Sequence, residues 1–130
     1  MLLLIFLVLV LLLVQVSLPG RYLTEQVGVA VQMGPRDALP EATQALARSR
    51  RALANLRETL SIFLTLAVLS IMLGEQGWVS LAGAMRYLVC RVAHLVCYLR
   101  GLSPWRSLSF LLATIGTVIM AVPLVPHIWS

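Results

Sequence analysis

The sequence contains no lysine, and all ten of its positively charged side chains are arginine. Charged residues of both signs make up only 12% of the 130 residues, whereas hydrophobic residues make up 60%. A soluble domain of this length has too little interior to bury so much apolar surface, so lipid is the expected solvent. The mean hydropathy of +0.94 agrees with this expectation. A continuous basic, solvated face is also missing, which argues against nucleic-acid binding.

Cysteine is scarce, since Cys90 and Cys97 are the only two and both fall in one apolar segment. Seven residues apart on a helix, they lie about two turns from each other, too far for a disulfide bond. We interpret them as small buried hydrophobic residues. The two histidines, His94 and His127, are expected at opposite membrane faces, so the sequence predicts no metal site. No nucleotide-binding loop, serine triad or zinc pattern is present.

Four apolar stretches predict four transmembrane helices, at roughly residues 1–20, 43–73, 77–100 and 106–128. The first lacks the positive start and small-residue cleavage site of a signal peptide, so we interpret it as a membrane helix that Pro19 and Gly20 kink or end. Sheet is not expected, because a membrane forbids open strand edges. The predicted fold class is an all-α, integral membrane four-helix bundle, with residues 1–130 in a single domain.

The distribution of arginine predicts an orientation in the membrane. Eight of the ten arginines lie either in the connection between the first two helices and the start of the second helix, or around Gly101. The turn at residues 74–77 has only one charged residue, Glu75. By the positive-inside rule, both arginine-rich connections face the cytoplasm and both chain ends face the outside.

Polar residues form one stripe on the second helix and another on the third. Within each stripe the side chains fall within about 60° of one another: Arg51, Asn55 and Glu58 on the second helix, and Arg91, His94 and Tyr98 on the third. An unpaired charge within the bilayer costs at least about 2.5–3.5 kcal/mol, so both stripes are expected to face the bundle interior. Two interpretations remain open, a shared binding pocket or a structural pairing of Glu58 with Arg91.

Both stripes belong to sequence runs that resemble a known family. Residues 50–58 resemble the Arg-Ala-x-x-Asn-x-x-Glu signature of the MAPEG family, the membrane-associated proteins of eicosanoid and glutathione metabolism. Residues 91–99, followed by Pro-Trp-Arg-Ser at 104–107, look like the microsomal prostaglandin E synthase branch and are similar to microsomal glutathione transferases. The resemblance spans most of the chain and is sharpest over residues 48–110. The overall pattern looks most like the short bacterial members.

The resemblance implies a homotrimer of four-helix bundles, with glutathione held between neighbouring subunits on the cytoplasmic side. The implied glutathione-binding residues are Arg51, Asn55, Glu58, His94 and Tyr98. Arg106 would lie near the sulfur with Ser107 beside it, as the catalytic residues. Guanidinium groups and an acidic side chain suit the two carboxylates and one amine of glutathione. A fixed cation also favours the thiolate of a thiol whose ordinary pKa is about 8.5.

The implied function is a membrane-bound, glutathione-dependent transferase or peroxidase that acts on a lipophilic electrophile entering from the bilayer. A bacterial inner membrane is the expected location. One alternative is a non-catalytic family member that binds lipid or a partner protein. A small transporter is less favoured, because proton coupling needs a titratable carboxylate at the substrate site and Glu58 sits beside arginines that keep it ionised.

Three departures from the family pattern bear on the site. Leu53 stands where several mammalian members have a polar residue. Thr59 stands where some members have tyrosine after the glutamate. The interval from Tyr98 to Arg106 is one residue shorter than in the prostaglandin synthase branch, so Arg106 is either displaced or its role passes to Arg100. Asp37 lies in a segment that resembles an acidic loop of that branch. A loop aspartate more often caps a turn, so Asp37 is a weak candidate.

Overall fold

The computed structural model describes residues 1–35 and 40–129, and this part of the chain is helical without any strand. Its elements in chain order are α1 (Leu2–Val27), α2 (Val29–Met33), α3 (Gln44–Met72), α4 (Trp78–Arg100), α5 (Ser103–Ala121) and the 3₁₀ helix η1 (Val122–Trp129). Four helices, the last running on from α5 through η1, are long and apolar enough to cross a membrane. The predicted all-α, four-helix fold class is confirmed. Asp37 lies outside the described residues.

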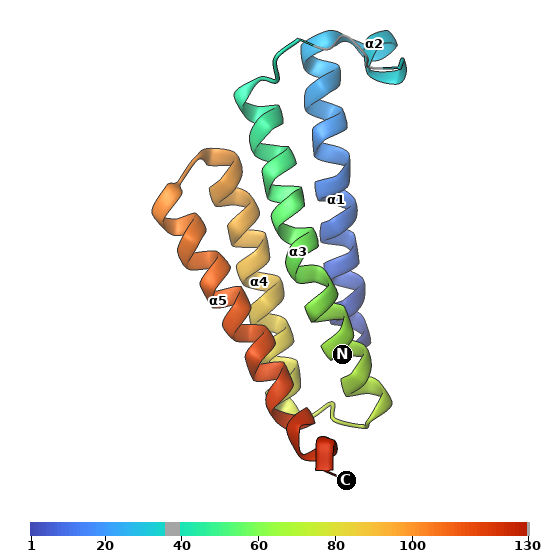
Figure 1. Ribbon diagram of the computed structural model, residues 1–130, viewed down its shortest axis with the longest axis vertical. Coiled ribbons are helices and arrows are strands. Elements are labelled where there is room, and N and C mark those ends of the chain that lie inside the picture. The colour runs from blue at the N-terminus through green and yellow to red at the C-terminus, as the bar shows by residue number, and fades with distance from the viewer. Residues whose placement is uncertain (36–39, 130) are drawn as a thin grey trace.

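The four long helices run side by side along the long axis of the molecule (Figure 1). α4 packs most extensively against α5, and α1 packs most extensively against α3. α3 and α4 join these two pairs in the middle of the bundle. The stripe-bearing helices of the sequence analysis, α3 and α4, are therefore direct neighbours.

The α4–α5 contact depends on two glycines that bring the backbones together. A Cβ on Gly83 would lie 2.7 Å from the carbonyl oxygen of Gly116, and a Cβ on Gly116 would lie 2.8 Å from the carbonyl oxygen of Gly83. Small residues permit this close approach, which increases the van der Waals packing that helps helices associate in lipid.

The centre of the bundle is an apolar core with one internal hydrogen bond. The rings of Phe63 on α3 and Tyr87 on α4 stack with centroids 4.5 Å apart, and both side chains are buried. The hydroxyl groups of Tyr87 and Thr59 share a hydrogen bond of 3.0 Å. Val8 of α1 and Ala84 of α4 belong to the same buried cluster. The bond fixes Thr59 and Tyr87 at one level of the bundle.

Two helix ends differ from the predicted ranges. α1 continues through Pro19 and ends at Val27, and the next residue, Gly28, has a positive φ of 87° that favours glycine. Proline is tolerated inside a membrane helix because neighbouring groups satisfy the freed carbonyl, so it does not end the helix. The last α-helix begins earlier than residue 106, with Pro104 in its first turn, and ends at Ala121 before Pro123. The chain then continues as the 3₁₀ helix η1.

Arg48 of α3 lies against the turn that ends α4. Its Nη1 donates to the carbonyl oxygen of Leu99 at 3.5 Å, and a Cβ on Gly101 would lie 2.7 Å from its Nη2. Gly101 has a φ of 71°, in the left-handed region, so glycine both closes the helix and leaves room for the guanidinium. A cation at a helix C-terminus is also favourable for the helix dipole.

Candidate functional site

Arg91 and Asn55 form the central polar contact between α3 and α4. The guanidinium Nη1 donates to the Oδ1 of Asn55 at 2.8 Å, and the Arg91 side chain is 0% exposed. Its other two nitrogens, Nε and Nη2, have no hydrogen-bond partner within the described chain. Buried guanidinium groups normally satisfy all their donors, so these two nitrogens are the unsatisfied part of the α3–α4 contact.

The proposed structural pairing of Glu58 with Arg91 is wrong. Glu58 is exposed, whereas Arg91 is buried and bonded to Asn55. Asn55 and Glu58 are three positions apart on α3, so their side chains are separated by about 60° around the helix axis. α3 buries the face that carries Ala52 and Leu56. With that face buried, Asn55 points toward Arg91 and Glu58 remains outside.

Tyr98 is the centre of a second cluster, to which α3, α4 and α5 all contribute. The Cζ of Arg106 on α5 lies 4.9 Å from the centroid of the Tyr98 ring, and the Cζ of Arg51 on α3 lies 6.0 Å from it. The ring of His94, one turn earlier on α4, lies 5.4 Å from the Tyr98 ring, centroid to centroid. Two guanidinium groups beside one aromatic ring form a cationic site with a flat apolar wall.

Arg106 lies against Tyr98 because the turn between α4 and α5 is short. Gly101 closes α4, and α5 begins at Ser103, so the first turn of α5 brings Arg106 back against the last turns of α4. Arg106 is half-buried, whereas Arg100 is exposed. Ser107, the next residue after Arg106, is also exposed.

Gln15 and Phe110 were not among the site residues that the sequence predicted, whereas His94 was. Both amide atoms of Gln15 on α1 lack a partner in the described chain, although its side chain is only 1% exposed. His94 has an unpartnered Nδ1 and is likewise buried. Phe110 of α5 lies beside His94, with ring centroids 6.4 Å apart. The signal available in the sequence was that Gln15 interrupts the long apolar run of α1 with a polar side chain.

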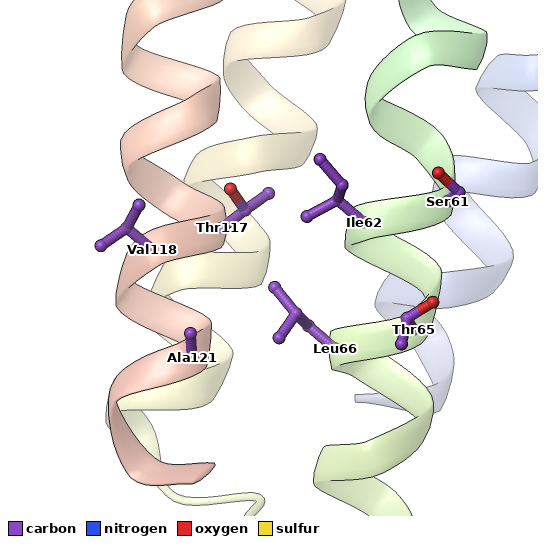
Figure 2. A pocket seen from close by; sticks show the side chains of 7 residues that line it. All are labelled: Ser61, Ile62, Thr65, Leu66, Thr117, Val118 and Ala121. Atoms are coloured by element: carbon purple, nitrogen blue, oxygen red, sulfur yellow. The ribbon is translucent and has the colours of Figure 1, made fainter. Parts of the chain in front are cut away.

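Two grooves open on the sides of the bundle. The larger, about 510 Å³, lies between α3 and α5 (Figure 2), and the other, about 440 Å³, lies between α1 and α4. Neither is lined by a predicted site residue. In the described chain no three His, Cys, Asp or Glu side chains gather in a way that could hold a metal ion.

A sequence model of the MAPEG family matches residues 1–125, which is nearly the whole chain. The chain belongs to the MAPEG family. No curated protein and no solved structure matches it. The family includes glutathione-dependent transferases and peroxidases as well as non-catalytic members. With its four apolar helices, this MAPEG protein is an integral membrane protein.

The residues of this MAPEG protein fit glutathione chemically. The described site offers guanidinium groups at Arg51, Arg91 and Arg106 for carboxylate and thiolate groups. Glu58 offers an exposed carboxylate for the amine. The unpartnered nitrogens of Arg91 and His94 have free hydrogen-bonding capacity within the described chain, and glutathione carries both donors and acceptors.

Proposed function

We propose that this protein is a membrane-bound, glutathione-dependent transferase or peroxidase that acts on lipophilic electrophiles. The observation that carries the proposal is the cluster at Tyr98, where Arg51 and Arg106 reach one aromatic ring from two different helices. A site with this excess of positive charge suits a ligand with two carboxylates and an ionisable thiol.

The residues divide into binding and catalytic roles. Arg51, Asn55, Glu58, His94 and Tyr98 hold glutathione, with guanidinium groups on its carboxylates and Glu58 on its amine. When bound, glutathione supplies a thiolate sulfur that forms a bond with the attacked atom of the electrophile, while a bond at that atom breaks and its electron pair moves to the neighbouring atom, which takes up a proton. With a hydroperoxide the O–O bond breaks and the alcohol leaves, and a second glutathione then gives glutathione disulfide and water.

Arg106 is the proposed catalytic residue because it is half-buried and held against Tyr98, so its charge is fixed in place. A fixed cation lowers the pKa of a neighbouring thiol, and each unit of lowering corresponds to about 1.4 kcal/mol. Ser107, the following residue on α5, is exposed and has a hydroxyl that can donate to the developing anion.

A homotrimer is part of the proposal, because α3 leaves a charged stripe uncovered. Thr59, the residue after Glu58, shares a hydrogen bond with Tyr87. At 1.5 Å per residue, Tyr87 lies about 14 Å along α4 from Trp78 at one end and about 20 Å from Arg100 at the other. Glu58 is therefore deep in the membrane span and exposed. Such a carboxylate is costly against lipid, so a neighbouring copy is expected to cover it.

The proposed orientation places the arginine-rich connections in the cytoplasm, where glutathione is abundant, and both chain ends outside. The turn after Arg100 and the start of α3 near Arg48 lie at the same end of the bundle, since Arg48 contacts Leu99 and Gly101. Under the positive-inside rule, the end of the bundle with more arginine faces the cytoplasm. We expect the membrane to be a bacterial inner membrane.

A non-catalytic, lipid-binding role is the second candidate, and the two apolar grooves favour it. Both grooves expose far more apolar than polar lining and are open to the side of the bundle. A protein with this role would keep the helical bundle but would not activate a thiol.

The test is a glutathione-dependent activity assay with the detergent-purified protein. We expect conjugation of a lipophilic electrophile, or reduction of a hydroperoxide with formation of glutathione disulfide, that depends on protein concentration. Arg106→Ala should lose most of this activity, whereas Arg50→Ala, an exposed neighbour of Arg51, should keep it. Activity that survives Arg106→Ala unchanged would contradict the assignment.

A further inference from the structure

The end of the bundle away from the arginine-rich connections carries a small pocket of about 240 Å³. It lies where the turn after α3, the start of α4 and the start of η1 meet, at the end of the bundle opposite to α2 (Figure 1). About 30 Å of α4, at 1.5 Å per residue, separates Trp78 from Tyr98, so the pocket is distinct from the candidate glutathione site. The residues that line it are Glu75, Gly77, Trp78, Val79, Ser80 and Pro123.

One wall of this pocket is the N-terminus of α4, which offers hydrogen-bond donors. No side chain caps this end, and its first turn contains no acidic residue. The first bond of the helix runs from the N–H of Leu81 to the carbonyl oxygen of Gly77, so the N–H groups of the three residues before Leu81 have no acceptor within α4. Such a cluster of N–H groups suits a phosphate.

Ser80 adds a buried hydroxyl to the same wall. Its side chain is 0% exposed, and its Oγ has no hydrogen-bond partner in the described chain. A buried hydroxyl without a partner is costly, and this one belongs to a residue that lines the pocket. A phosphate held by the first turn of α4 would be an acceptor for the Ser80 hydroxyl as well.

The other side of the pocket suits a positive charge. Oε1 of Glu75 lies 2.8 Å from Nε2 of His127, and the Glu75 side chain is 38% exposed, so the carboxylate can accept further hydrogen bonds. The indole of Trp78 lines the pocket and is largely exposed. A carboxylate accepts charge-assisted hydrogen bonds from an ammonium group, and the face of an indole attracts a cation.

The pocket lies at the level of the lipid headgroups. Trp78 and Trp129 are both exposed at this end of the chain, and tryptophan is enriched at the membrane–water interface. The hydrocarbon core of a bilayer is about 30 Å thick, which matches the length of α4 between this end and Tyr98. A ligand that carries both a phosphate and an ammonium group is present at that level, as the headgroup of a zwitterionic phospholipid.

We propose that this pocket binds the headgroup of phosphatidylethanolamine. The phosphate accepts from the first-turn N–H groups of α4 and from Ser80, and the ammonium group donates to Glu75 beside the ring of Trp78. Phosphatidylglycerol lacks the ammonium group and brings its phosphate close to Glu75 without compensation. The methylated ammonium of phosphatidylcholine has no N–H to donate. The proposal does not depend on the proposed function, because the two sites lie at opposite ends of the bundle.

Native mass spectrometry of the detergent-purified protein tests the headgroup preference. The probe is an equimolar mixture of phosphatidylethanolamine, phosphatidylcholine and phosphatidylglycerol with identical acyl chains. We expect the wild type to retain phosphatidylethanolamine about tenfold more than phosphatidylglycerol. Ser80→Ala, a small change in a buried position, should lower this retention about fivefold. Glu75→Gln should abolish the preference over phosphatidylglycerol. Equal retention of the three lipids by the wild type would overturn the proposal.

Two matched variants separate the pocket from its surroundings. Trp78 and Trp129 are 80% and 79% exposed, but only Trp78 lines the pocket. Trp78→Leu should therefore weaken retention of phosphatidylethanolamine, and Trp129→Leu should not. His127→Ala removes the neighbour of Glu75 and leaves the carboxylate, so it should keep the headgroup preference. If His127→Ala abolished the preference as Glu75→Gln does, the contact between the two side chains would be the cause, and the proposal would fail.

A soluble headgroup decides the source of the ligand. Glycerophosphoethanolamine has the same phosphate and ammonium groups without acyl chains, and we expect it to displace the lipid only in large excess. Displacement at equal concentration would overturn the assignment to a membrane lipid. Ser80→Ala should bind glutathione as the wild type does. A wild type that retains phosphatidylethanolamine and binds no glutathione would therefore contradict the proposed function and leave the lipid site in place.

Discussion

Arg91 donates a 2.8 Å hydrogen bond to Asn55 from a position where its side chain has no exposed surface. The buried charge of Arg91 therefore meets one amide oxygen within the described chain, and its other two nitrogens have no hydrogen-bond partner there. This relationship connects the stability of the α3–α4 contact with the chemistry of the candidate site.

Asn55→Leu should destabilise the protein, because it leaves the buried guanidinium without its partner. We expect a loss of about 2–3 kcal/mol, as for an unsatisfied buried charged donor, measured by thermal unfolding in detergent. Asn55→Leu combined with Arg91→Met should recover much of this loss, since both polar groups are then gone. If the double variant were destabilised as much as Asn55→Leu alone, the hydrogen bond between Arg91 and Asn55 would contribute little to stability.

Thr59→Val should also destabilise, because the buried hydroxyl of Tyr87 loses its partner. The expected loss is about 1–3 kcal/mol. A double-mutant cycle with Tyr87→Phe checks the cause, since the second substitution should cost little once Thr59 is valine. Strictly additive effects of the two substitutions would show that the hydroxyl groups do not interact.

Gly116→Ala should loosen the α4–α5 pair, because the new methyl group would lie 2.8 Å from the carbonyl oxygen of Gly83. Overpacking of this kind typically costs about 1–3 kcal/mol. Gly20→Ala is the matched control inside a helix, since its Cβ would meet only the flexible end of Gln32 at 3.4 Å. Thermal unfolding should separate the two variants, and equal stability would contradict the tight glycine contact.

The spans were predictable from the sequence because lipid demands long apolar helices, but their ends were not. Pro19 suggested a stop for the first helix, yet the helix continues to Val27 because membrane surroundings tolerate an internal proline. At the other end, Pro123 does stop the α-helix, and the chain continues as a 3₁₀ helix. Composition determines that a segment spans the membrane, whereas local hydrogen bonding determines where it ends.

The candidate site was predictable as two stripes but not as a set of contacts. Spacing alone places Asn55 and Glu58 on the same side of α3, and the rotation of α3 against α4 decides which one meets Arg91. That rotation follows from the packing of Ala52, Leu56 and Phe63, which sequence patterns do not resolve. The position of Arg106 against Tyr98 depended on the turn at Gly101, whose conformation the spacing of the residues does not determine.

Arg51→Ala and Arg106→Ala should have different kinetic effects. Arg51 is exposed on α3, where it can bind a carboxylate, so its loss should weaken glutathione binding. KM for glutathione should rise by about tenfold, which corresponds to the free energy of about one charge-assisted hydrogen bond. Arg106 should mainly affect kcat, because its proposed interaction strengthens as the thiolate forms. Steady-state kinetics at varied glutathione concentration separate these effects. Identical changes in both parameters for the two variants would remove the division of roles.

The most direct test of the central claim is calorimetric titration of glutathione into the detergent-purified protein, with glutathione disulfide as the control ligand. We predict saturable binding of glutathione, weaker binding of the disulfide, and a clear loss of affinity in Arg51→Ala. A folded wild-type protein that releases or absorbs no heat at millimolar glutathione would contradict the account and favour a non-catalytic membrane role.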